Sequence, residues 1–146
     1  MHLKIVVLGF VFCCFGIAAG SANDEVSVSL YLAENIPPPP QALVAPEKLH
    51  HRLREVFGFE HYELLKRGEI DLKSHWEQWV LPRKDFFIRL EPLPNKTGET
   101  PLLDYELYKD GFIVAKGQYE PHEGTPLFIN GPDFKQGRLI FVLEAR

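Results

Sequence analysis

The sequence predicts an α+β fold that is mostly β: an antiparallel sheet or sandwich of about nine strands, with one amphipathic helix packed on it. Short runs of alternating apolar and polar residues recur along most of the chain, as in half-buried strands. A single segment, near residue 50, has the apolar spacing of a helix. Most of the runs are joined by short connections, which favour antiparallel neighbours.

The N-terminal segment has the composition of a signal peptide. Lys4 precedes an apolar run from Ile5 to Ile17, and small residues follow it. The run is shorter than the roughly 20 residues that a membrane-spanning helix needs. We therefore expect residues 1–22 to be removed, with cleavage after Gly20 as an alternative, and residues 23–146 to form a single β-rich domain without a stable membrane span.

The two cysteines and the charge narrow the class of protein further. Cys13 and Cys14 lie inside the apolar run, so the processed chain has no thiol and gains nothing from disulfides. Small secreted animal domains are usually rich in disulfides. Because the processed chain would have no cysteine, we favour a secreted or periplasmic bacterial protein. The net charge is −4 with mixed signs along the chain, so we expect no nucleic-acid partner.

The first predicted strand covers residues 26–32, "VSVSLYL", where valine and leucine alternate with serine and tyrosine. This pattern is typical of a strand with one buried face. The run Pro37 to Pro40 that follows forbids helix and sheet pairing and favours a stiff polyproline II segment. We interpret it as a spacer, with recruitment of a partner as the alternative.

A helix is predicted between Pro46, which suits a first turn, and Gly58, which suits the end of a helix. Its apolar residues share one stripe and should pack on the sheet face that contains the first strand: Leu49, Leu53, Val56 and Phe57. His51 and Glu55, one turn apart, are interpreted as part of a solvated face, because a zinc site there would need a further ligand.

The rest of the chain is predicted to contain strands alone. The segment 61–73 reads as two short strands about a turn near Arg67-Gly68, and 75–81 and 85–93 as two more. Asp110-Gly111 is a preferred two-residue hairpin turn between two alternating runs. The last two strands, 125–129 and 137–145, are expected to be joined by a loop that opens on Asn130-Gly131-Pro132.

Motifs of common enzyme classes are missing from the sequence. It has no G-x-S-x-G, no H-E-x-x-H, no phosphate-binding loop and no G-x-G-x-x-G. A Ser/His/Asp triad stays open, because its members assemble from distant positions. We therefore expect no cofactor and favour a protein that is not an enzyme.

Two weak candidate sites involve the segment 61–79. His61, Glu63, His75 and Glu77 would converge on a divalent metal if their two strands were neighbours in register. The alternative, which we favour, is that each His-x-Glu pair is the polar side of an amphipathic strand.

The second candidate is a carbohydrate site made of Trp76, Glu77 and Trp79. Tryptophans desolvate an acid and stack on sugar rings, although core packing of Trp76 or Trp79 is the more common role.

The function expected from these observations is a non-catalytic binding or assembly module of the bacterial cell envelope, in which an exposed sheet edge or face engages a partner. The partner would be another envelope protein or a glycan. The alternatives are a secreted carbohydrate-binding or carbohydrate-hydrolysing domain and a divalent-metal-binding periplasmic protein.

Overall fold

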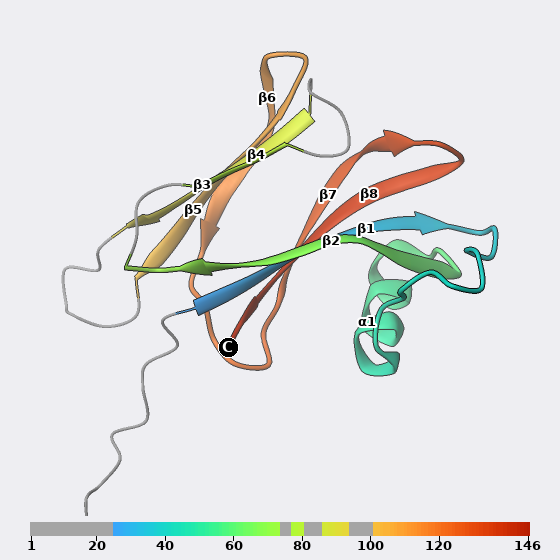
Figure 1. Ribbon diagram of the computed structural model, residues 1–146. Helices are drawn as coiled ribbons and strands as arrows, with labels where there is room; N and C mark the ends of the chain where they lie inside the picture. The colour runs from blue at the N-terminus through green and yellow to red at the C-terminus, as the bar shows by residue number, and fades with distance from the viewer. Residues whose placement is uncertain (1–24, 74–76, 81–85, 94–100) are drawn as a thin grey trace, which may run out of the picture.

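The computed structural model describes residues 25–73, 77–80, 86–93 and 101–146, and for 77–80 it describes the backbone (Figure 1). The predicted signal peptide lies outside this part of the chain. The elements are β1 (Glu25–Glu34), α1 (Glu47–Phe57), β2 (His61–Asp71), β3 (Glu77–Val80), β4 (Phe86–Leu93), β5 (Leu102–Lys109), β6 (Phe112–Tyr119), β7 (Leu127–Phe134) and β8 (Gly137–Ala145).

The strands form two antiparallel four-stranded sheets, ordered β2-β1-β8-β7 and β3-β4-β5-β6. We call them the first and the second sheet. Figure 1 shows the second sheet on one side of the first and α1 on the other. The predicted fold class, mostly β with one helix packed on antiparallel sheets, is confirmed, with eight strands in the described residues in place of about nine.

The main core lies between the two sheets. It is built from alternate residues of both, such as Val28 and Leu30 of β1 and Ile88 of β4, all fully buried. The rings of Phe86 on β4 and Phe141 on β8 are 5.9 Å apart and join the two layers. The two sheets therefore share one hydrophobic core, as in a β-sandwich.

Strand β1 lies in the interior of the first sheet and is buried on both faces, so the prediction of a strand with one buried face is wrong. Val28 and Leu30 face the second sheet, and Tyr31 and Ala33, on the opposite face, pack with Leu53 of α1 in a second buried cluster. The alternation in the sequence predicts which residues share a face of β1, but it does not predict which layer packs against each face.

Helix α1 has the predicted ends and packs on the predicted face of the first sheet. Pro46 precedes it, and Gly58 ends it with a φ of 79°, which glycine adopts without strain. Leu49 and Leu53 are buried, and Phe57 packs against Phe128 of β7.

The predicted burial of Val56 is wrong, because 60% of this side chain is exposed. At the last turn of α1 the sheet presents Phe128, which contacts Phe57 on the other side of the apolar stripe. Among the described residues nothing comparable covers Val56.

Strand β2 is a single strand of 11 residues, so the predicted turn near Arg67-Gly68 is wrong. Gly68 pairs with Val28 inside a continuous ladder with β1. The pairing skips Leu65, because Leu30 pairs with Lys66 and Tyr31 with Leu64. This bulge reverses the alternation, so that one end of β2 faces α1 and the other end faces the sandwich core.

The prediction of a loop that opens on Asn130-Gly131-Pro132 is also wrong, because β7 continues through these residues to Phe134. The pairing with β8 shifts by one residue between Asn130 and Asp133, and this irregularity accommodates the proline, which has no N–H to donate.

The hairpin at Asp110-Gly111 is confirmed: β5 and β6 flank it, and the two residues have φ values of 52° and 82°. Within the described ranges, α1 falls short of the length and hydropathy needed to cross a membrane, and there is no longer helix.

Candidate functional site

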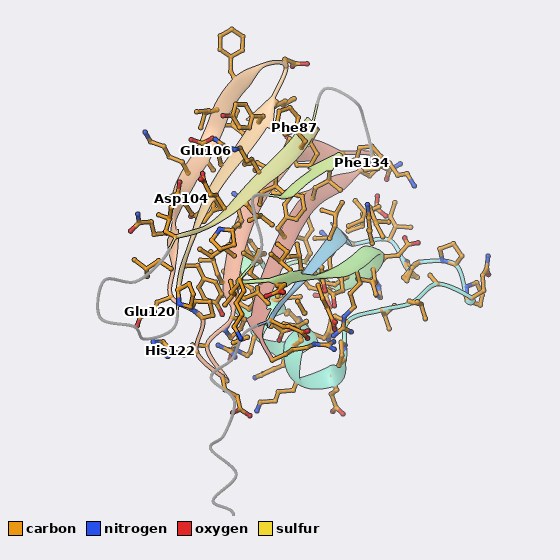
Figure 2. The ribbon with its side chains drawn as sticks, turned by 60° about the vertical axis from the view of Figure 1, so that its left-hand side comes forward. Phe87, Asp104, Glu106, Glu120, His122 and Phe134 are labelled. Atoms are coloured by element: carbon orange, nitrogen blue, oxygen red, sulfur yellow. The ribbon has the colours of Figure 1, made fainter. Side chains whose placement is uncertain are left out.

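The second sheet has one face in the core and one face that no described element covers. Ile88 and Leu90 of β4 face the core, so the intervening Phe87, Arg89 and Glu91 lie on the opposite, open face. Figure 2 shows Phe87, Glu106 and Asp104 on this sheet. The first sheet differs, because α1 covers its outer face.

A row of apolar side chains crosses the open face close to the hairpin. Phe87 of β4 pairs with Tyr108 of β5, which pairs in turn with Ile113 of β6. The rings of Phe87 and Tyr108 stack with centroids 4.7 Å apart and an angle of 13° between their planes. Aromatic pairs of this kind add to the contact energy of a binding surface.

A bulge in β6 extends this row into an exposed apolar tip. Leu107 pairs with Ala115 and Tyr108 with Ile113, so that Val114 has no opposite residue. The exposed fractions of Phe112, Ile113 and Val114 are 74%, 47% and 54%. Three consecutive exposed apolar residues at the end of a strand are unusual for a surface that meets only water.

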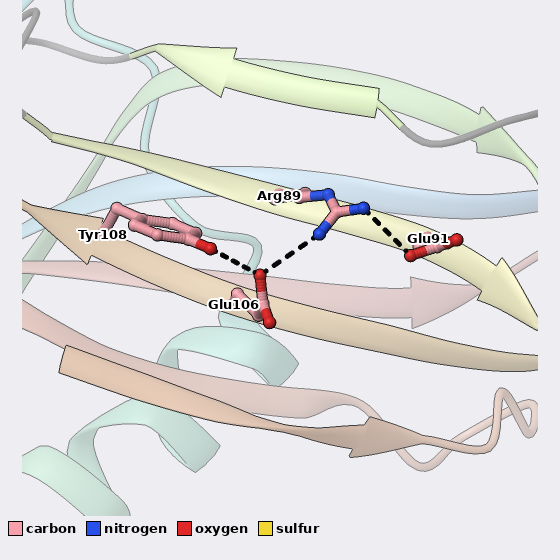
Figure 3. Close-up of polar contacts among 4 residues, drawn as sticks. All are labelled: Arg89, Glu91, Glu106 and Tyr108. Atoms are coloured by element: carbon pink, nitrogen blue, oxygen red, sulfur yellow. Dashed lines mark hydrogen bonds and ion pairs between the residues drawn. The ribbon is translucent and has the colours of Figure 1, made fainter. Parts of the chain in front are cut away.

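A hydrogen-bonded set of polar residues lies beside the aromatic pair (Figure 3). Glu106 accepts a hydrogen bond of 2.6 Å from the Tyr108 hydroxyl, and Arg89 donates to the same carboxylate at 3.4 Å. Arg89 also donates to Glu91 at 3.2 Å. These contacts hold the side chains of β4 and β5 in one arrangement on the open face.

The pKa values in this set favour an ionised carboxylate. The hydrogen bond from Tyr108 is the main cause that lowers the pKa of Glu106, and the charge of Arg89 lowers it further. The same hydrogen bond raises the pKa of Tyr108. A general acid needs a raised carboxyl pKa, so Glu106 is suited to accept hydrogen bonds instead of donating a proton.

Strand β6 is an edge strand, and its outer edge pairs with no strand of the described ranges. The other edges are less open. Residues Leu43 to Ala45 cover the start of β2 through hydrogen bonds to Tyr62 and Leu64. Edge strand β3 has only four residues, and β7 is interrupted by its irregular pairing.

The predicted carbohydrate residues lie in and before β3. Trp76 is outside the described residues. Glu77 and Trp79 are in β3, where their backbones pair with Leu90 and Ile88 of β4. Strand β3 is thus the neighbour of the strand that carries Phe87 and Arg89, and the carbohydrate site stays a prediction.

The predicted metal residues are divided between the two sheets. His61 and Glu63 lie on β2 of the first sheet and Glu77 on β3 of the second, while His75 is outside the described residues. Strands β2 and β3 are therefore not paired neighbours, whereas the predicted metal site required the two strands to be neighbours in register. In the described ranges no three His, Asp or Glu side chains come together in a group suited to a metal ion.

Sequence reasoning missed the open face of the second sheet. Two signals for it were present: the consecutive Phe86 and Phe87, one for each face of a strand, and the run Phe112 to Val114 directly after the hairpin turn. Comparisons of the chain with protein-family models, with curated proteins and with solved structures find no match.

Proposed function

We propose that the protein is a non-catalytic binding or assembly module of the bacterial cell envelope, exported by its N-terminal signal peptide. Its binding surface is the edge of β6 with the adjacent open face, and the partner supplies an extended segment with apolar side chains. The observation that carries the proposal is the exposed run Phe112 to Val114 on an open edge strand.

An extended polypeptide fits this surface for two reasons. The free edge of β6 offers backbone N–H and C=O groups, which an added strand satisfies in a regular ladder from Ala115 to Tyr119. At the hairpin end of β6 the apolar tip continues that edge, and the Phe87–Tyr108 pair extends the apolar area across β5 and β4, so the partner's side chains could remove this area from water.

A second copy of the chain fits the edge less well. A symmetric antiparallel pair of β6 strands centred on Lys116 would place the two Lys116 side chains together, and like charges in cross-strand positions are destabilising. A pair centred on Gly117 would place Lys116 opposite the uncharged Gln118, so the lysine would gain no partner of opposite charge. The net charge of −4 also opposes association of identical chains.

Site-specific photo-crosslinking tests the proposal. A photoreactive phenylalanine analogue replaces Phe112 in cells, and a matched one replaces Val56, which is comparably exposed on α1. We expect one discrete adduct from position 112, mapped to an extended segment of another envelope protein, and none from position 56. Adding Ile113→Asp to the first variant should abolish the adduct.

Three outcomes would contradict the proposal. One is the absence of any adduct from position 112, and another is the same set of adducts from both positions. An adduct of twice the mass of the chain would show that the occupant is a second copy. Export has its own test: mass spectrometry of the natural protein should show a chain that starts after residue 22.

Carbohydrate binding on the same open face is the second candidate, because the face combines an aromatic pair with charged hydrogen-bonding groups. A glycan array with the purified protein tests it. Binding to a polysaccharide that Tyr108→Ala abolishes would support this candidate, and no response on the array would exclude it.

A further inference from the structure

A cavity of about 240 Å³ lies at the opposite side of the molecule from the open face, on the first sheet. Three parts of the chain form it. Tyr31, Arg67 and Glu144 come from the sheet face, Lys48 and Arg52 from the first turns of α1, and His122 from the connection between β6 and β7. In Figure 2 the connection with His122 lies at the same end of the molecule as α1.

The charges of the cavity are opposite in sign to those of the chain. Three basic residues, Lys48, Arg52 and Arg67, face one acid, Glu144, whereas the chain as a whole has a net charge of −4. The ring of His122 lies 3.3 Å from the carboxylate of Glu120. The cavity thus has an excess of positive charge in an acidic protein.

Two of these basic groups are available to a ligand. Lys48 and Arg67 form no ion pair or hydrogen bond with another side chain of the described residues. Arg52 is held in place, because it donates a hydrogen bond of 3.1 Å to the carbonyl of Gly124 and lies 5.9 Å from the centre of the Phe128 ring. A fixed guanidinium retains further donors for an oxyanion.

The bulge in β2 is what places Arg67 in the cavity. Because the pairing with β1 skips Leu65, Arg67 pairs with Ser29 and shares the helix side of the sheet with Tyr31. Regular alternation from Tyr62 and Leu64 would have turned residue 67 to the other face. Bulges are common where a strand has to redirect a functional side chain.

The first turn of α1 adds to the positive potential. Pro46 precedes the helix without a side-chain cap, and Pro46 and Leu49 both line the cavity. The free N–H groups of a first helical turn carry a partial positive charge that favours an anion. The apolar surfaces of Pro46, Leu49 and Pro126 leave room for a small non-polar body behind the charged group.

We infer that this cavity binds a small organic oxyanion, a phosphate monoester or a carboxylate, through Lys48, Arg52 and Arg67. The volume of about 240 Å³ restricts the ligand to a small molecule. The site is independent of the β6 edge, so either proposal can fail without the other.

A nuclear magnetic resonance titration of the amide signals tests the inference with three probes of similar size: phenyl phosphate, benzoate and uncharged benzyl alcohol. We expect saturable shifts at Lys48, Leu49 and Gly124 with at least one anion and none with the alcohol. Tighter binding of phenyl phosphate would identify a phosphate monoester as the ligand class, and tighter binding of benzoate a carboxylate.

Charge-removing variants connect the binding to these residues. Arg67→Gln and Lys48→Gln should each weaken binding of the anion by about tenfold or more, because each removes a charge-assisted hydrogen bond. Lys109→Gln, at the distant β5–β6 hairpin, should leave the affinity unchanged. All three positions are exposed, so the variants retain the fold.

The inference would be overturned by an absence of saturable shifts with both anions. It would also be overturned if benzyl alcohol bound equally well, or if Lys109→Gln weakened binding as much as Arg67→Gln.

Discussion

At the scale of single residues, the open face is organised by the hydrogen bond between Tyr108 and Glu106. This bond is the largest cause of the lowered pKa of Glu106, ahead of the Arg89 charge. Tyr108→Phe should therefore raise the pKa of Glu106 toward its ordinary value of 4.5. Carbon-13 titration of the Glu106 carboxyl measures the change, and an unchanged pKa in Tyr108→Phe would contradict this cause.

The lowered pKa of Glu106 has a defined effect on stability against pH. A carboxyl group whose pKa is lower in the folded state binds fewer protons there than in the unfolded chain over the interval between the two values. Its contribution is present above the ordinary pKa and is lost as the pH falls through the folded value. Glu106→Gln should flatten this acid branch of the stability curve, measured by urea unfolding across the pH range. An unchanged acid branch would contradict the assignment.

Ser27 is a buried residue whose hydroxyl has no hydrogen-bond partner in the described part of the chain. Burying an unpaired hydroxyl is unfavourable, so Ser27→Ala should raise the free energy of unfolding by about 0.5 to 1 kcal/mol. Ser29→Ala, equally buried two residues along β1, is the matched control and should give no such gain, because the Ser29 hydroxyl is not an unpaired buried group. Denaturant unfolding of the two variants gives the comparison; equal effects would refute it.

At the scale of secondary-structure elements, α1 is attached to the first sheet mainly through Leu53. This side chain is fully buried, and the Leu53 carbonyl accepts a hydrogen bond of 2.9 Å from the Tyr62 hydroxyl. Leu53→Ala should lower the free energy of unfolding by about 2 to 4 kcal/mol. Val56→Ala, one turn away and exposed, should change it by less than about 0.5 kcal/mol. Similar losses in both variants would contradict the packing described for the helix.

The hairpin between β7 and β8 approaches β1 so closely that it requires glycine. A Cβ atom at position 137 would collide with the backbone carbonyl of Ala33. Gly137→Ala should therefore lower the free energy of unfolding by about 1 to 3 kcal/mol, whereas Gln136→Ala beside it should have little effect. Thermal and denaturant unfolding measure both, and a stable Gly137→Ala variant would refute the close contact.

Local chemistry in the sequence predicted the elements whose ends depend on it. Pro46 and Gly58 gave the ends of α1, and Asp110-Gly111 gave the hairpin, because proline fixes its own φ and glycine adopts the positive φ that these positions require. The predictions failed where distant partners decide the structure. Gly68 is held in an extended strand by its pairing with β1, and no residue near it in the sequence carries that information.

The basic cavity and the apolar tip also depend on distant partners, and so the sequence alone could not predict them. Both depend on a bulge, at Leu65 for the cavity and at Val114 for the apolar tip, and a bulge is a property of two paired strands. The alternation along one strand therefore could not predict which face of the sheet carries Arg67 or Ile113. It could indicate only whether each segment was apolar or basic.

At the scale of the whole molecule, the sandwich separates two surfaces with different chemistry. The first sheet carries α1 and the basic cavity on its outer side, and the second sheet leaves its outer face and the β6 edge open. In Figure 1 the β5–β6 hairpin projects away from α1. The proposed polypeptide partner and the proposed anion would therefore occupy separate surfaces.

The most direct test of the proposed function is amide hydrogen exchange of the purified protein, alone and with the solubilised envelope fraction of its cells. The proposal predicts slower exchange in β6, above all from Ala115 to Tyr119, and unchanged exchange in α1. Unchanged exchange in β6, or equal slowing in α1, would contradict the assignment of this edge as the binding surface.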